Sequence, residues 1–287
     1  MIYMKSDEII NVFDKRFKKV KKHYNKSFED FEIEEIHGFR LEMKKLRTFI
    51  RLINTSIPEE KKIKIGGKIK SFYNTTGNIR NFQLHQQRVS HICDDMLLEK
   101  PVLYLQLLHN EESMLKKKAG QIADKISYNH FRKKIVDLVP DKLNTESVRA
   151  FIIQKKHTLL ELILLLDYSD EALHEIRKVL KDLLYDWKYI SSYVPAALPA
   201  YFTTKKNIEV FADKLGEFYD LCIALYFFKP VYIDKIADEK EKKILLTLRQ
   251  KLELTKGEMK EEISALLNHI KPEKKNKDVL QEVYEIL

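Results

Sequence analysis

An internal repeat is the feature that most constrains the fold of this chain of 287 residues. Residues 18–53 resemble residues 155–190 at a constant offset of 137 positions, and both apolar and basic positions are preserved. The basic positions that match are Lys18 with Lys155, Lys19 with Lys156, His37 with His174, Arg40 with Arg177, and Lys44 with Lys181. Because two classes of side chain recur together, the sequence predicts that both segments have the same local structure.

A second block repeats further along the chain. Residues 72–84, FYNTTGNIRNFQL, resemble residues 211–223, FADKLGEFYDLCI, at an offset of 139, which a two-residue insertion explains. The matching pairs are Phe72 with Phe211, Gly77 with Gly216, Ile79 with Phe218, Asn81 with Asp220, and Leu84 with Ile223. The repeats predict two halves, residues 1–140 and 141–287, related by a pseudo-twofold axis.

Glycine and proline are scarce, with seven residues of each. Average proteins hold about 7% glycine and about 5% proline, so this composition disfavours β-sandwiches, β-barrels and glycine-rich nucleotide-binding folds. The predicted helices are 6–24, 33–54, 59–92, 101–125, 128–138, 146–167, 170–191, 204–228, 233–268 and 276–286. We therefore expect an all-α fold, a single domain of two four-helix bundles whose second half ends in a short helix.

The net charge of +9 suggests an acidic partner but does not choose among nucleic acid, anionic membrane and polyphosphate. Cys93 and Cys222 lie far apart, which argues against a disulfide framework or a structural zinc site. His91, Cys93 and Asp94 are badly spaced for one metal ion. The N-terminus lacks an export signal, and the apolar run Leu159–Leu166 is far shorter than the ~20 residues that span a bilayer, so we expect a cytoplasmic location.

Five cationic side chains share one face of the predicted helix 33–54. They occupy an arc of roughly 80° over about 20 Å, and they are His37, Arg40, Lys44, Arg47 and Arg51. Between His37 and Arg51 the only acid is Glu42. Like charges at i, i+4 spacing cost a few tenths of a kcal/mol each, so an external anion is expected to compensate them. Arginine suits phosphate oxygens, and a line of cations suits a polymer of phosphates.

The matching face of the second half is weaker. It carries His174, Arg177, Lys181 and Lys188, flanked by Lys178. Leu184 stands where the first copy has Arg47, and Glu175, Asp182 and Asp186 add negative charge. Either stripe alone could be an ordinary solvated face, but repetition at matching positions favours binding. Each histidine could be structural or could donate a hydrogen bond to an anion.

These segments resemble a known family. IHGFRLEMKKLRTFIRLI and LHEIRKVLKDLLYDWKYI, each followed about 40 residues later by TGNIRNFQL or LGEFYDLCI, are similar to the two halves of a CHAD domain, the conserved-histidine α-helical domain. The resemblance covers nearly the whole chain. It implies two four-helix bundles around a basic groove or pore that binds inorganic polyphosphate. Carried over by position, it implies anion contacts for His37, Arg40, Lys44, Arg47, His174, Arg177 and Lys181.

Three positions depart from the family pattern. Leu184 and Tyr219 replace basic residues of the second copy, and Asn81 replaces the usual acid of the first. The second half is therefore expected to grip phosphate less tightly or to use Lys178 and Lys188 instead. Arg80 is retained; it could pair structurally with an acid or face the ligand, and we expect the structural role. Two pairs of lysines also repeat in register, and we expect them to be surface residues. They are the next candidates for additional anion contacts: Lys18, Lys19, Lys155 and Lys156.

Other functions are less well supported. An enzyme acting on phosphates needs a metal site or a positioned nucleophile, and neither is evident. Some CHAD domains are fused to a triphosphate-tunnel enzyme, whose signature is a strand with the pattern Glu-x-Glu-x-Lys. Glu32 and Glu34 match its glutamates, but no lysine follows at the required position. A histidine phosphotransfer bundle would use one reactive histidine, whereas a nucleic-acid-binding protein would place aromatic rings among the cations. We expect a non-catalytic protein that binds polyphosphate or another linear polyanion without a cofactor. Association with polyphosphate granules and the oligomeric state are left open.

Overall fold

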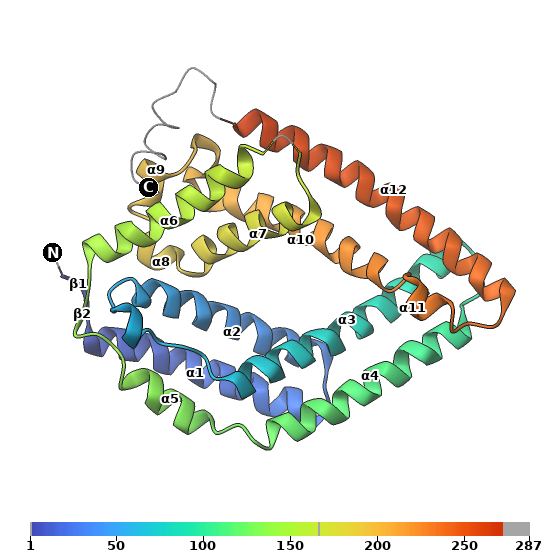
Figure 1. Cartoon of the computed structure of the whole chain (residues 1–287), viewed down its shortest axis with the longest axis horizontal. Helices are drawn as coiled ribbons and strands as arrows, with labels where there is room; N and C mark the ends of the chain where they lie inside the picture. The colour runs from blue at the N-terminus through green and yellow to red at the C-terminus, as the bar shows by residue number, and fades with distance from the viewer. Residues whose placement is uncertain (1, 166, 272–287) are drawn as a thin grey trace.

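The structure, a computed structural model, describes residues 2–165 and 167–271. It is built almost wholly from helices, which confirms the all-α prediction (Figure 1). The main helices are α1 (Ser6–Glu29), α2 (Ile33–Asn54), α3 (Gly67–Asp95), α4 (Val102–Ala123), α5 (Tyr128–Val136), α6 (Thr145–Ile163), α7 (Asp170–Tyr185), α10 (Lys205–Tyr226) and α12 (Glu239–Ile270). The shorter elements are β1 (Ile2–Lys5), η1 (Glu59–Lys61), β2 (Lys142–Asn144), α8 (Trp187–Ile190), α9 (Val194–Ala197), η2 (Ala200–Thr203) and α11 (Pro230–Ile233).

Several predicted boundaries were wrong, each for a local reason. The predicted helix 59–92 is divided into η1 and α3, because Gly66 is extended and caps the start of α3. The predicted helix 170–191 breaks at Asp186, whose φ of −106° and ψ of 10° end α7 and lead into α8. The last long helix begins at Glu239, after the side chain of Asp238 accepts a hydrogen bond from Glu241 N. The predicted helix 276–286 lies outside the described residues.

Helices of the two repeats follow one another in the same order. In the first half α1 packs on α2, α2 on α3 and α3 on α4, and in the second half α6 packs on α7, α7 on α10 and α10 on α12. The repeated segments thus occupy corresponding helices, α2 with α7 and α3 with α10. Closed four-helix bundles, their pseudo-twofold relation and the division near Pro140 stay predictions.

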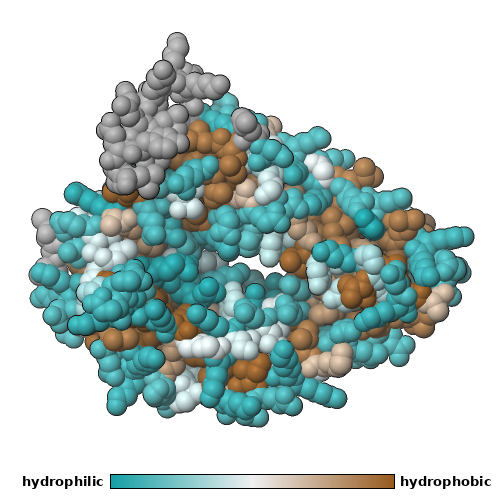
Figure 2. Space-filling view, in the orientation of Figure 1, coloured by the Kyte–Doolittle hydropathy of each residue, from teal (hydrophilic) through white to brown (hydrophobic). Residues whose placement is uncertain are grey.

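The two halves are joined at both ends of the molecule. At one end β1 pairs with β2 in an antiparallel ribbon, and Ser6 N donates to Asp141 O at 2.9 Å. At the other end Glu241 of α12 accepts from the backbone N–H groups of Leu103 and Tyr104 at 2.9 and 3.1 Å. Between these two joints the molecule is hollowed near its centre (Figure 2). Helices α2 and α3 face α7 and α10 across this region (Figure 1).

Two apolar cores hold this frame. The larger core runs through both halves and includes Phe39 of α2, Phe72 of α3 and Ile176 of α7, all fully buried. Burial of side chains of this size contributes ~1.5–3 kcal/mol each, which fixes α2 and α7 in position. The smaller core joins α3 and α4 to α10 and α12 near the second joint. Within the described residues, no helix is long and apolar enough to cross a membrane.

Candidate anion-binding site

The apolar face of α2 determines where its cations lie. Phe39, Met43 and Leu46 are buried in the larger core, so the stripe that begins at His37 is directed away from it. Glu42, the acid within the stripe's sequence, is itself buried and accepts a hydrogen bond from Lys45 at 2.6 Å. The one carboxylate that α2 supplies in this stretch therefore does not neutralise the stripe.

Arg40 crosses from α2 to α3. Its guanidinium group lies over the ring of Tyr73, 4.2 Å from the centroid, and donates to the backbone oxygen of Tyr73. It also lies directly against Gly77, where a Cβ atom would come within 2.6 Å of Arg40 Cζ. Burial lowers the pKa of Arg40, and nearby Arg80 and Arg47 lower it further. Gly77 is therefore the position on α3 that makes room for this guanidinium group.

Arg177 repeats the arrangement in the second half. Its Nε and Nη2 atoms lie 3.3 and 3.4 Å from where a Cβ atom on Gly216 of α10 would stand. The Nε atom is buried and has no hydrogen-bond partner among the described residues. Each repeat thus pairs one arginine with one glycine of the next long helix: Arg40 of α2 with Gly77 of α3, and Arg177 of α7 with Gly216 of α10. This pairing explains why both residue types recur in the sequence.

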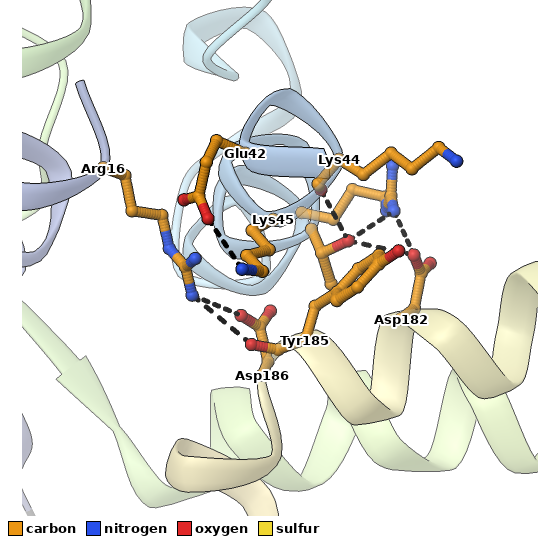
Figure 3. A network of polar contacts seen from close by, with 9 residues as sticks. Arg16, Glu42, Lys44, Lys45, Asp182, Tyr185 and Asp186 are labelled. Atoms are coloured by element: carbon orange, nitrogen blue, oxygen red, sulfur yellow. Dashed lines mark hydrogen bonds and ion pairs between the residues drawn. The ribbon is translucent and has the colours of Figure 1, made fainter. Parts of the chain in front are cut away.

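Lys44 lies where the cations of both halves converge. Burial lowers its pKa to about 7, and the next causes are the positive charges of Arg40, Arg177, Arg80 and Lys181. These four residues come from α2, α3 and α7. No ion pair links Lys44 to an acid among the described residues, and Figure 3 shows its side chain extending with no dashed contact at the amino group. The fold therefore concentrates positive charge at this point.

Both signature histidines border this region. The ring of His174 stacks on Tyr219 at a centroid distance of 4.0 Å and an interplanar angle of 18°. Burial lowers the pKa of His174 to about 4, and Lys178 and Arg177 lower it further. The pKa of His37 is also lowered, first by burial and then by Arg80. Both rings are therefore mainly neutral at pH 7. The Nδ1 atom of His174 is buried without a partner among the described residues.

Four of the predicted anion contacts are already paired with acids. Arg51 and Lys155 both contact Asp182, Lys181 contacts Asp213 at 2.7 Å, and Lys178 contacts Glu175 at 2.5 Å. Figure 3 shows Asp182 beside α2, so an acid of the second half neutralises a cation of the first. The sequence indicated a weaker second stripe, but it did not indicate that Asp182 would reach Arg51.

The remaining predicted cations lie apart from Lys44 or at the surface. Lys18 lines a small outer pocket of about 250 Å³ between α1 and α5, and Lys19 is exposed on α1. Lys156 is half-buried on α6. Lys188 is exposed on α8, beyond the break at Asp186, so the helical period of α7 no longer places it beside Lys181.

Arg47 stays close to the cluster, although its side chain is exposed. Its guanidinium carbon lies 5.4 Å from the centroid of the Tyr73 ring. Arg40 contacts the same ring at a shorter distance, so Tyr73 makes cation–π contacts with two arginines of α2. Cation–π contacts of this kind are worth about 0.5–1 kcal/mol at exposed sites, which helps to hold like charges close together.

Sequence reasoning favoured the structural role of Arg80 over the ligand-facing one, and it missed Tyr73, which also lies on α3. Arg80 was predicted to pair with an acid, but no such ion pair exists among the described residues, and its charge instead affects His37, Arg40 and Lys44. Tyr73 was not considered. The spacing of Tyr73, Gly77 and Arg80 at i, i+4 and i+7 puts all three on one helical face, and that pattern could have identified them.

No group of three or more His, Cys, Asp or Glu side chains that could hold a metal ion occurs in the part of the chain that the structure describes. The two cysteines, Cys93 and Cys222, are unbonded.

The fold and the cluster define a class, an all-α protein that gathers cations from two repeated halves at its centre. The family model of the CHAD domain matches residues 11–229, and the chain belongs to the CHAD family, which is associated with polyphosphate binding. The crystal structure of the CHAD domain from the plant Ricinus communis has a TM-score of 0.68 at 14% identity, over 93% of this chain and 92% of that one. PptA from Streptomyces chartreusis has a TM-score of 0.65 at 12% identity, over 92% and 98%. No curated protein matches the chain.

Proposed function

We propose that this protein binds inorganic polyphosphate at the cationic cluster between its two halves. The observation that carries the proposal is the position of Lys44, which lies among Arg40, Arg80 and Arg177 with no acid partner in the described residues. Membership of the CHAD family supports the same ligand. The contacts we assign to it are His37, Arg40, Lys44, Arg47, Arg80, His174 and Arg177.

The physical reason is the cost of holding like charges together. Cations of three helices converge there, and burial has already lowered the pKa of Lys44 to about 7. A bound polyanion would remove both penalties, because it supplies negative charge and favours protonated Lys44. Arginine forks match phosphate oxygens, and successive phosphates could contact both halves in turn. A single small anion could reach only part of the cluster.

Nucleic acid is a poorer fit to the same surface. Proteins that bind single strands without sequence preference stack bases on aromatic side chains, at about 1–3 kcal/mol per base. Here the ring of Tyr73 is covered by Arg40 and Arg47, and the ring of Tyr219 is covered by His174. Each of these rings therefore already stacks with a protein side chain, which leaves less ring surface for bases.

We propose further that binding is not followed by chemistry. Phosphotransfer would need a histidine oriented as a nucleophile, yet no carboxylate hydrogen-bonds to either His37 or His174 among the described residues. Incubation with radiolabelled polyphosphate tests this point. Shortened polymer or label on His37 would contradict the proposal.

The central experiment is a titration with long polyphosphate, triphosphate and single-stranded DNA at several salt concentrations. If each of the five assigned cations (Arg40, Lys44, Arg47, Arg80 and Arg177) contacts one phosphate, log affinity should fall with log salt at a slope of about −3.5, using the single-strand coefficient of about 0.7 per contact. Arg40→Ala combined with Arg177→Ala should weaken binding and flatten the slope. Lys117→Ala combined with Lys118→Ala, which removes two exposed charges from α4, is the matched control. Equal affinity for DNA, or no loss in the arginine variant, would overturn the proposal.

The location of the protein in the cell is a separate proposal. A protein that binds polyphosphate in the cytoplasm should collect on polyphosphate granules. Imaging of a fluorescent fusion tests this, with the Arg40→Ala plus Arg177→Ala variant as the comparison. A diffuse signal for both proteins would contradict the granule proposal.

A further inference from the structure

Asp182 of α7 is an anion placed inside the cationic surface. Its Oδ1 atom accepts from Thr48 Oγ1 at 3.0 Å and from Arg51, and its Oδ2 atom accepts from Lys155 Nζ at 2.7 Å. Thr48 and Arg51 belong to α2 and Lys155 to α6, so this single carboxylate joins three helices. Both of its oxygens are engaged, as phosphate oxygens would be.

The pairing withdraws two cations from the surface. The side chain of Lys155 is only 13% exposed, so its contact with Asp182 is well shielded from salt. Arg51 is more exposed, but it is held on two sides because it also donates to Thr48 at 2.9 Å. A phosphate could use either cation only by displacing the carboxylate, which would leave Asp182 buried without its partners.

Lys44 lies just before this network on α2. Thr48 Oγ1 lies 3.1 Å from the backbone oxygen of Lys44, which shares the single hydroxyl proton with Asp182, while the amino group of Lys44 extends clear of the network (Figure 3). Along α2, Lys44 and Arg47 have no acid partner among the described residues, so the change from unpaired to paired cations falls between Arg47 and Arg51. The acid is not part of the repeat, since the position that matches Asp182 at offset 137 is Lys45.

We infer that Asp182 is a specificity-determining residue that ends the polyphosphate-binding surface at Arg47, before Arg51. It does so by holding Arg51 and Lys155 as internal ion pairs, and the number of phosphates that the protein engages is limited accordingly. This inference rests on the proposed function, because it describes the extent of the same surface.

The test is a double-mutant cycle on Asp182 and Arg51, read by the affinity for long polyphosphate and its salt slope. Asp182→Asn keeps an oxygen for Thr48 but releases the two cations, so affinity at low salt should rise about tenfold and the slope should steepen by about 0.7 to 1.4. Arg51→Gln alone should change neither quantity. In the Asp182→Asn background the same substitution should reverse part of the gain.

Glu258→Gln on α12 is the control, because it removes one exposed negative charge outside the network. Circular dichroism and a melting curve establish that each variant is folded. If Asp182→Asn fails to fold, the affinity of Arg51→Gln for long polyphosphate still tests the inference. A loss of affinity in Arg51→Gln as large as the loss in Arg47→Gln would overturn it. A salt slope unchanged from wild type in folded Asp182→Asn would also overturn the inference. In that case, binding of polyphosphate by the wild type would still support the proposed function. A wild type with no affinity for polyphosphate would overturn both.

Discussion

The guanidinium group of Arg40 on α2 occupies the space that a Cβ atom on Gly77 of α3 would need. Arg177 and Gly216 repeat this relationship between α7 and α10, although less tightly. Glycine in the middle of a helix costs about 1 kcal/mol relative to alanine, so both helices give up stability at these positions. In return each arginine packs directly against the neighbouring helix.

Gly77→Ala should therefore lower the affinity for polyphosphate without a matching loss of folding stability. Gly77→Ala should displace Arg40 from its place over Tyr73 and lower polyphosphate affinity about tenfold, whereas Gly216→Ala should have a smaller effect because Arg177 lies at 3.3 Å or more. The measurements are titration with polyphosphate and chemical denaturation of both variants. Equal losses of affinity in the two variants would contradict the packing argument, and a loss explained by unfolding would appear in the denaturation curves.

Lys44 predicts a pH dependence of binding. With a pKa of about 7 in the free protein, Lys44 is largely neutral above that pH, and a bound anion should restore its proton. Affinity should therefore fall as pH rises above 7, by up to tenfold per pH unit, and binding should take up to one proton. Calorimetry in two buffers of different ionisation enthalpy measures this uptake.

Lys44→Arg is the matched variant for that prediction. Arginine keeps its charge throughout this range, so the fall in affinity between pH 7 and pH 9 and the proton uptake should both disappear. A pH profile that is the same in wild type and Lys44→Arg would show that another group carries the titration.

The sequence was sufficient for most of the helices and for the stripe on α2, but it was insufficient for the contacts between helices. The predicted helix 33–54 has the bounds of α2, because an apolar face and a cationic face with a period of 3.6 residues specify a helix locally. The pairing of Arg51 with Asp182 joins residues 131 positions apart and depends on how α2 crosses α7. No periodic pattern contains that information, whereas the helical face that Tyr73, Gly77 and Arg80 share on α3 could be recognised from their spacing.

Tyr219 accounts for part of the asymmetry between the halves. It stands at the position that matches Arg80, and it stacks on His174 where Arg80 instead adds positive charge near His37. Tyr219→Arg should therefore raise polyphosphate affinity and steepen the salt slope by about 0.7, the value of one added contact. Tyr219→Phe keeps the stacked ring and should bind as the wild type does. A gain in the phenylalanine variant, or none in the arginine variant, would count against this explanation.

Asp186 predicts how stability depends on pH. The residue is fully buried, neither oxygen has a hydrogen bond in the described structure, and Arg16 approaches Oδ1 only to 4.0 Å. Burial raises the pKa of Asp186 from 3.8 to about 8, and the positive charges of Arg16 and Arg51 only partly oppose this. Between about pH 4 and pH 8 the unfolded state has therefore released a proton that the folded state still holds. The contribution of Asp186 to the free energy of unfolding should fall through this window, with a limiting slope of about 1.4 kcal/mol per pH unit.

Asp186→Asn isolates that contribution, because asparagine has nearly the same shape and does not ionise. The variant and the wild type should have similar stability near pH 4, and the variant should become progressively more stable than the wild type up to about pH 8. Above that pH both states of the wild type are ionised at this position, so the difference should become constant. Urea denaturation at half-unit steps from pH 4 to pH 9 measures the difference, and parallel curves would mean that Asp186 ionises alike in the folded and unfolded states.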